Sequence, residues 1–104
     1  MNKRLEMLEK LTSSGKADSF AWYALAMEYR KEKRIAEALA TFEKLRTSDP
    51  DYVPMYLMAG QMLLEAARSA EAVPWLEQGM ERARARGDTK ALSELEQALS
   101  EARS

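Results

Sequence analysis

The sequence predicts an all-α fold in which antiparallel helix-turn-helix units repeat along the chain. One set of six apolar or small residues occurs twice, 34 residues apart. Spacings of three, four and seven residues place each set on helix faces, and no segment alternates with the period of a strand. A repeat of this length indicates stacked helix pairs that bury their apolar faces against their neighbours. The first copy is Trp22, Leu25, Ala26, Tyr29, Ala38 and Phe42, and the second is Tyr56, Ala59, Gly60, Leu63, Ala72 and Leu76.

The first helix is predicted near residues 2–14 from an apolar stripe and a stop signal. Leu5, Leu8 and Leu11 share one face of this helix. Gly15 follows two serines, and glycine is the residue best suited to the left-handed conformation that ends many helices. We therefore expect a short capping helix that covers the open end of the repeats.

The second and third helices form the first complete unit. Asp18 or Ser19 caps a helix that runs to about Lys31, because short polar side chains accept hydrogen bonds from free N–H groups at helix starts. A tight turn at residues 33–34 leads to a helix at about 35–47. The predicted inward residues are Trp22, Leu25, Ala26 and Tyr29, followed by Ala38, Phe42 and Leu45.

The fourth helix is predicted at about residues 52–66. Pro50 disfavours helix at Asp49 and so ends the preceding element, while Asp51 is expected to accept hydrogen bonds from the N–H groups of the next helix. Pro54 falls in the first turn, where no intrahelical N–H bond is lost. The inward residues are expected to be Tyr56, Ala59, Gly60 and Leu63.

The fifth helix is predicted from Ser69 to about Arg86. Pro74 lies just past its first turn, which predicts a kink or a later start. Gly87 ends the helix, and Asp88 caps a sixth one. The aligned residues of the sixth helix are Leu92, Leu95 and Leu99.

The spacing within each unit resembles the tetratricopeptide repeat. The matching residues of the first unit are Trp22, Leu25, Ala26, Tyr29, Ala38, Phe42 and Pro50. The resemblance implies one domain over residues 1–104, built as a short right-handed superhelix of about six helices. Its parts are an N-terminal capping helix in 1–16, repeats at 19–52 and 53–86, and a C-terminal capping helix at 88–102. Lys33 and Ala67 stand where the family often has Gly or Asn in a left-handed conformation, which predicts either a small loss of stability or an altered turn.

Core packing is predicted to combine small residues at close helix contacts with large side chains beside them. Ala26 is expected to face Ala38, and Gly60 to face Ala72. Trp75 is expected on a partly exposed side of the fifth helix, either as a partner contact or packed over Pro74 or against the sixth helix. The aromatic side chains expected in the first core are Trp22, Tyr29 and Phe42.

Composition excludes several functional classes. The chain has 0 Cys and 0 His, which removes disulfides, the common metal ligands and the usual nucleophile and base. We therefore expect no enzyme, no cofactor and no metal. The net charge of −1 argues against nucleic-acid binding. The basic cluster at residues 30–34 is interleaved with Glu28 and Glu32, which favours a solvated helix end over the alternative of a phosphate-binding patch. Because the N-terminal segment mixes charges with leucines, we expect neither a signal peptide nor a membrane span, and a cytoplasmic location.

The resemblance implies a protein-interaction module that binds a peptide or helix through an apolar concave groove. The groove would be lined by the first helices of successive repeats and rimmed by Arg30, Lys31 and Lys90, which suits a partner with acidic flanks. Two alternatives remain: a structural homo-oligomer, such as a homodimer, that uses the same apolar face, and purely internal packing. The expected partner-binding residues are Phe20, Tyr23, Met27, Arg30, Lys31, Leu57, Met58, Gln61, Leu64 and Lys90.

One binding mode of the family is not expected here. Members that hold a terminal carboxylate use Lys, Asn and Arg at set positions of their first helices. The corresponding residues of this chain are Tyr23, Met27, Met58, Lys90 and Glu94. Only Lys90 agrees, so recognition of such carboxylate tails is not predicted.

Overall fold

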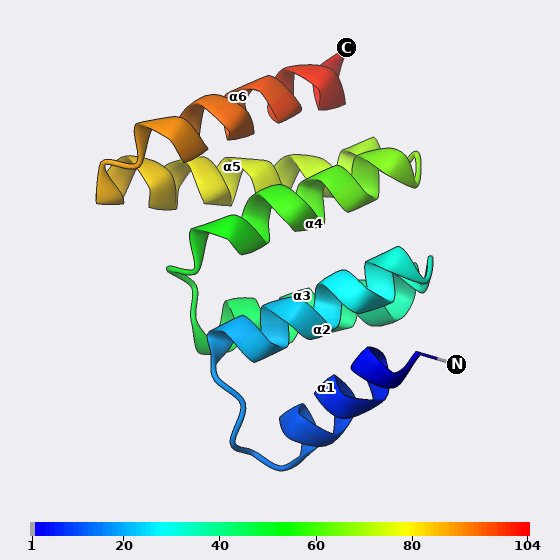
Figure 1. Ribbon diagram of the computed structural model, residues 1–104. Coiled ribbons are helices and arrows are strands. Elements are labelled where there is room, and N and C mark those ends of the chain that lie inside the picture. The colour runs from blue at the N-terminus through cyan, green and yellow to red at the C-terminus, as the bar shows by residue number, and fades with distance from the viewer. Residues whose placement is uncertain (1) are drawn as a thin grey trace. The chain divides into compact units, whose positions relative to one another are not determined.

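The computed structural model describes residues 2–104, which contain six α-helices and no strand. This confirms the predicted all-α class (Figure 1). Each helix end lies within one residue of its expected place. The chain divides into two compact units, one up to Pro50 and the other from Asp51 to Ser104. The first unit holds α1 (Lys3–Ser13), α2 (Ser19–Lys31) and α3 (Ile35–Ser48), and the second holds α4 (Val53–Glu65), α5 (Ser69–Arg86) and α6 (Thr89–Arg103).

In the first unit, α1 packs on α2 through a stripe that differs by one residue from the predicted one. Leu5 and Leu8 are buried, but Leu11 is 40% exposed and its expected place is taken by Thr12. Seven residues make about two turns of helix, so Thr12 returns to the side of Leu5 while Leu11 does not. The buried hydroxyl of Thr12 donates a hydrogen bond to the Leu8 carbonyl oxygen at 2.9 Å.

Polar contacts also join α1 to α2. The carboxylate of Glu28, only 9% exposed, lies 3.0 Å from Arg4 Nε and accepts a 3.0 Å hydrogen bond from Asn2 Nδ2. The Tyr29 hydroxyl donates to Glu9 Oε2 at 2.6 Å. Burial, followed by this hydrogen bond to Glu9, raises the pKa of Tyr29 to about 12. The phenol therefore stays protonated and able to donate over the whole neutral range.

Small and large residues are fully buried together in α2 and α3. Ala26 and Ala38 have no exposed area, and Phe42 is likewise fully buried. Trp22 was expected in this core but is only half-buried, with Lys44 Nζ 5.0 Å from the centroid of its ring. It thus lies at the edge of the unit, where an ammonium can stack on the ring face.

Side-chain caps fix the start of α2. The carboxylate of Asp18 accepts a 2.9 Å hydrogen bond from the N–H of Ala21, which identifies Asp18 as the capping residue. The neighbouring Ser19 hydroxyl instead donates to Asp49 Oδ2 at 2.6 Å. Because Asp49 follows α3, this bond ties the start of α2 to the end of α3.

Four helices end next to a residue in the left-handed conformation, and the stop predicted at Gly15 after α1 is one of them, with a φ of 78°. Lys33 and Ala67 have φ values of 62° and 60°, and Gly87 has a φ of 69°. After Lys33 and Ala67, the N–H of the next residue returns to a helix carbonyl five residues earlier, at 2.9 and 2.8 Å. Both turns therefore adopt the left-handed conformation rather than an altered one, although neither Lys33 nor Ala67 favours it.

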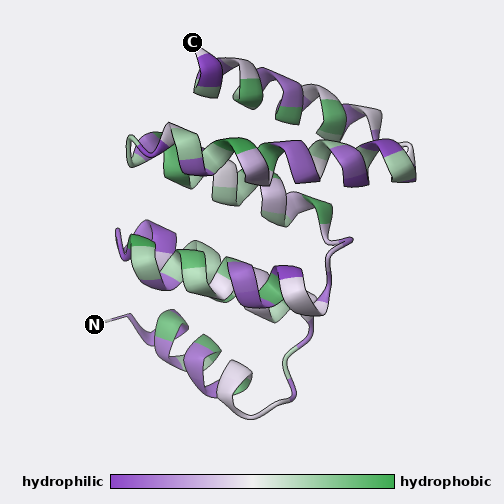
Figure 2. Cartoon of the chain, turned by 180° about the vertical axis from the view of Figure 1, so that it is seen from behind, coloured by the Kyte–Doolittle hydropathy of each residue, from purple (hydrophilic) through white to green (hydrophobic). Residues whose placement is uncertain are grey.

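In the second unit, α5 packs against both α4 and α6, and two glycines allow the close approach. A Cβ added to Gly60 would overlap the side chain of Leu76, so Leu76 rather than the expected Ala72 is its nearest neighbour. A Cβ on Gly79 would lie 2.5 Å from Tyr56 Cβ on α4 and 2.9 Å from Leu95 Cδ2 on α6. Figure 2 shows the apolar residues of α6 on the side toward α5.

Trp75 belongs to the core of the second unit. Its side chain is 5% exposed, and its ring centroid lies 6.2 Å from that of Tyr56. The expectation of a partly exposed position was wrong, because the ring is buried beside Tyr56 of α4. The expected later start of α5 was also wrong, since the helix runs unbroken from Ser69 through Pro74.

The ends of α4 and α6 differ in how they are capped. Tyr52 precedes α4 and its side chain makes no capping bond, so the predicted capping role of Asp51 was wrong. The Asp51 carboxylate instead forms an ion pair with Arg82 of α5, with 3.0 Å between Asp51 Oδ1 and Arg82 Nη1. This pair connects the segment before α4 to α5. The predicted cap of α6 is confirmed, because Asp88 Oδ1 accepts a 3.0 Å hydrogen bond from the N–H of Ala91.

The strained end of α4 provides a stability test. Replacing Ala67 by Gly removes the Cβ contact that makes the left-handed conformation costly, so we expect the free energy of unfolding to rise by about 0.5–1 kcal/mol. Ala66→Gly is the matched control, because Ala66 has a φ of −85° and the same change there lowers stability. Urea denaturation measures both, and a loss of stability in Ala67→Gly would contradict the assigned backbone.

The close contact at Gly79 provides a second test. Whether Gly79→Ala raises or lowers the free energy of unfolding shows whether this position is crowded. Alanine is the better helix former by about 1 kcal/mol, so Gly79→Ala would stabilise an uncrowded helix. We expect it instead to lower the free energy of unfolding by about 1–3 kcal/mol, because the methyl overlaps Tyr56 and Leu95. Ser93→Ala on the exposed side of α6 is the control, expected to be neutral or slightly stabilising in the same denaturation assay.

Candidate functional site

The candidate site is a groove between α4 and α6, which run in the same direction and contact each other. Its larger hollow, about 320 Å³, lies near the starts of both helices, and a smaller one of about 140 Å³ follows farther along. The larger hollow is lined by Val53, Pro54, Leu57, Met58, Asp88, Lys90, Ala91, Glu94 and Leu95. The smaller is lined by Gln61, Glu94, Gln97, Ala98 and Glu101. We refer to these residues together as the α4–α6 groove.

Helical periodicity explains why these residues meet. Val53, Leu57 and Gln61 recur every four residues on one side of α4 and face a matching stripe of α6. Val53 and Leu57 are 5% and 9% exposed, so they form an apolar floor. On the α6 side, Ala91 and Ala98 carry only a methyl group, and this leaves space between the two helices.

The two hollows differ in polarity. Apolar side chains dominate the first one, with Lys90 and Glu94 at its rim. The second is bordered by the amides of Gln61 and Gln97 and by the carboxylates of Glu94 and Glu101. The groove therefore offers an apolar pocket beside a polar, negatively charged one.

Comparisons with known proteins place the chain in a family. Residues 19–62 match the model of the tetratricopeptide repeat. The crystal structure of a tetratricopeptide repeat domain protein from Salinibacter ruber is 42% identical, has a TM-score of 0.75, and the match covers 83% of this chain and 97% of that one. The chain belongs to the tetratricopeptide repeat family. Domains of this family are generally protein–protein interaction modules built on a typically non-catalytic scaffold.

Two further structures resemble this tetratricopeptide protein. A solution structure of the Salinibacter ruber domain is 42% identical with a TM-score of 0.75, and the match covers 82% of this chain and 86% of that one. The solution structure of a Bordetella parapertussis protein has a TM-score of 0.83 over 99% of this chain and 90% of that one. At 24% identity the latter shows the shared fold alone. A search of curated proteins found no match.

The structure brings together part of the predicted binding set. Leu57, Met58 and Lys90 line the larger hollow and Gln61 the smaller one, whereas Leu64 lines neither. Sequence reasoning missed the wall formed by residues 53–54 and 91, and it gave Glu101 no place in the groove. An alanine in a helical pattern is compatible both with close helix packing and with a hollow beside the helix. The sequence alone therefore did not identify Ala91 as part of a groove wall.

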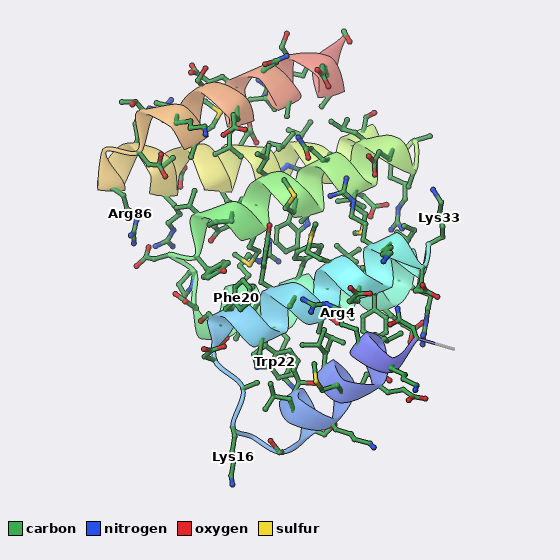
Figure 3. All side chains as sticks on the ribbon, viewed as in Figure 1. Arg4, Lys16, Phe20, Trp22, Lys33 and Arg86 are labelled. Atoms are coloured by element: carbon green, nitrogen blue, oxygen red, sulfur yellow. The ribbon has the colours of Figure 1, made fainter. Side chains whose placement is uncertain are left out.

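The remaining predicted residues lie on α2 of the first unit. Phe20, in its first turn, is 62% exposed and is labelled in Figure 3. Tyr23, Met27 and Arg30 are half-buried, and Lys31 borders a polar depression at the start of α1. Their role in binding stays a prediction.

Other features of the tetratricopeptide chain are less suited to a ligand. A broad depression of about 550 Å³ follows α1 alone and is lined by Glu6, Glu9, Lys10, Ser13 and Ser14. One polar helix face lacks the opposing wall that a specific site needs. Within residues 2–104, no group of three or more acidic side chains is arranged to hold a metal ion. No helix of that range is long and apolar enough to span a membrane.

Proposed function

We propose that this tetratricopeptide protein is an interaction module that binds a short peptide segment of another protein in the α4–α6 groove. The observation that carries the proposal is the hollow of about 320 Å³, which has a buried apolar floor and a polar rim. Small-molecule and cofactor pockets typically occupy roughly 300–1,000 Å³. One large apolar side chain of a partner, with part of its backbone, fits a space at the lower end of that range.

A preformed groove favours binding because few of its side chains and little of its backbone have to become ordered when a partner binds. α4 and α6 are both held against α5, through Tyr56 and Leu95 on either side of Gly79. The groove walls are thus rigid, which limits the entropy lost when a partner binds. Met58 adds a flexible side chain at the edge that can adjust to partners of different shape.

The α2 face is proposed as a second contact surface. It comprises Phe20, Tyr23, Met27, Arg30 and Lys31, and the exposure of Phe20 supports it. A large apolar ring that is 62% exposed loses unfavourable contact with water when a partner covers it. The groove and the α2 face can be tested separately, because each lies within one unit.

The groove is tested by filling it. A random heptapeptide library displayed on phage is selected against the wild-type protein, and the dissociation constant of a selected peptide is measured by fluorescence anisotropy. Ala91→Leu places a larger side chain in the hollow while keeping a good helix former, so we expect binding to weaken about tenfold, or about 1.4 kcal/mol. Amide NMR shifts caused by the peptide are expected to cluster in residues 53–61 and 90–101.

Ala85→Leu is the control variant, since Ala85 is exposed on α5 and lines neither hollow of the α4–α6 groove. It makes the same chemical change outside the groove and is expected to leave the dissociation constant unchanged. Selection of no peptide, or equal binding by wild type and Ala91→Leu, would refute the proposed function.

Self-association is a second candidate, favoured by the exposed ring of Phe20. Static light scattering at two protein concentrations separates the two. An interaction module for other proteins is expected to give a mass near 11.8 kDa at both concentrations. A mass that doubles at the higher concentration and returns to the monomer value in Phe20→Ser would favour a homodimer through the α2 face.

A further inference from the structure

The charges along the α4–α6 groove are unbalanced. Three carboxylates, Asp88, Glu94 and Glu101, border it against the single ammonium group of Lys90. Asp88 and Lys90 are both at the first hollow, so the second hollow has carboxylates and no cation. Glu94 and Glu101 are seven residues apart and therefore lie on the same side of α6, about 10 Å apart along its axis.

Neither Glu94 nor Glu101 is neutralised within residues 2–104, where no ion pair or side-chain hydrogen bond involves either carboxylate. Other acids of the same unit do find partners: Asp51 pairs with Arg82 at 3.0 Å and Glu77 with Arg103 at 2.7 Å. A basic side chain of a binding partner could therefore pair with two carboxylates that form no ion pair within residues 2–104. The amides of Gln61 and Gln97 lie beside these carboxylates.

On the basis of the proposed function, we propose that the α4–α6 groove selects peptides that carry a large apolar residue and, two positions away, a lysine or arginine. Leu57 in the first hollow and Gln61 in the second are four residues apart, which corresponds to about 6 Å along α4. Side chains two positions apart on an extended peptide lie about 6.6 Å apart on the same face. The apolar side chain enters the first hollow while the basic one reaches the second.

This preference differs from the acidic partner flanks expected from Arg30, Lys31 and Lys90. Two of those cations lie on α2, and at the groove itself Lys90 is outnumbered by carboxylates. Electrostatic complementarity acts here mainly on specificity and on the association rate, because the rim carboxylates are exposed. The apolar side chain of the peptide binds in the larger hollow. The carboxylates at the smaller hollow then favour those apolar peptides that also carry a basic residue.

The test uses the heptapeptide library and a charge-neutral variant of the groove. The wild type and Glu94→Gln/Glu101→Gln are selected in parallel at low salt, and the selected sequences are compared. Glutamine is close to glutamate in size, so the hollows keep their shape while both charges are lost. Glu96→Gln is the matched control, because Glu96 is an exposed carboxylate of α6 that borders neither hollow.

We expect wild-type selection to enrich lysine or arginine two positions from the apolar residue, and the double variant to lose that enrichment. Exposed ion pairs change affinity by a factor of about two to five each, so the double variant is expected to bind a selected basic peptide roughly fivefold more weakly. The difference is expected to vanish near 1 M salt, where the Debye length falls to about 3 Å.

The outcomes separate this inference from the proposed function. If peptides lose binding in Ala91→Leu but show acidic residues or no charge preference at that position, the basic specificity is refuted and the groove function stands. Equal binding of a basic peptide by wild type and the double variant refutes the specificity in the same way. If no selected peptide responds to Ala91→Leu, both proposals fail together.

Discussion

The packing of α5 against its two neighbours in the second unit depends on the absence of a side chain at Gly79. Any Cβ there would meet Tyr56 Cβ and Leu95 Cδ2 well inside van der Waals contact. Because Tyr56 and Leu95 belong to α4 and α6, one small residue sets how closely both helices approach α5. The rings of Tyr56 and Trp75 then fill the volume beside that contact, with centroids 6.2 Å apart.

The groove is a consequence of the same arrangement. Because α4 and α6 are both packed on α5, the distance between them is set by α5. Their own side chains then determine how much of the space between them is filled. Ala91 and Ala98 fill little, so a hollow remains above the floor made by Val53 and Leu57. Tight packing on one side and small residues on the other together produce a rigid cleft, which is the property that a binding module of this family needs.

Much of the fold could be predicted because local chemistry determines helix ends. The cap at Asp88 and the stop at Gly87 were both expected from residue type and position. The errors arose where rotation about a helix decides exposure. Thr12 rather than Leu11 is buried, and an apolar pattern of three-residue steps does not resolve that choice.

The sequence by itself determined the helices, their boundaries, the 34-residue repeat and the family, because hydrogen-bonding caps and apolar periodicity act within short segments. Only the tertiary structure decided that Trp75 packs on Tyr56, that Gly60 meets Leu76, and that Glu94 and Glu101 border a polar hollow beside an apolar one. These contacts join residues far apart in the chain. They depend on the distance and rotation between packed helices, which periodicity within one helix does not specify.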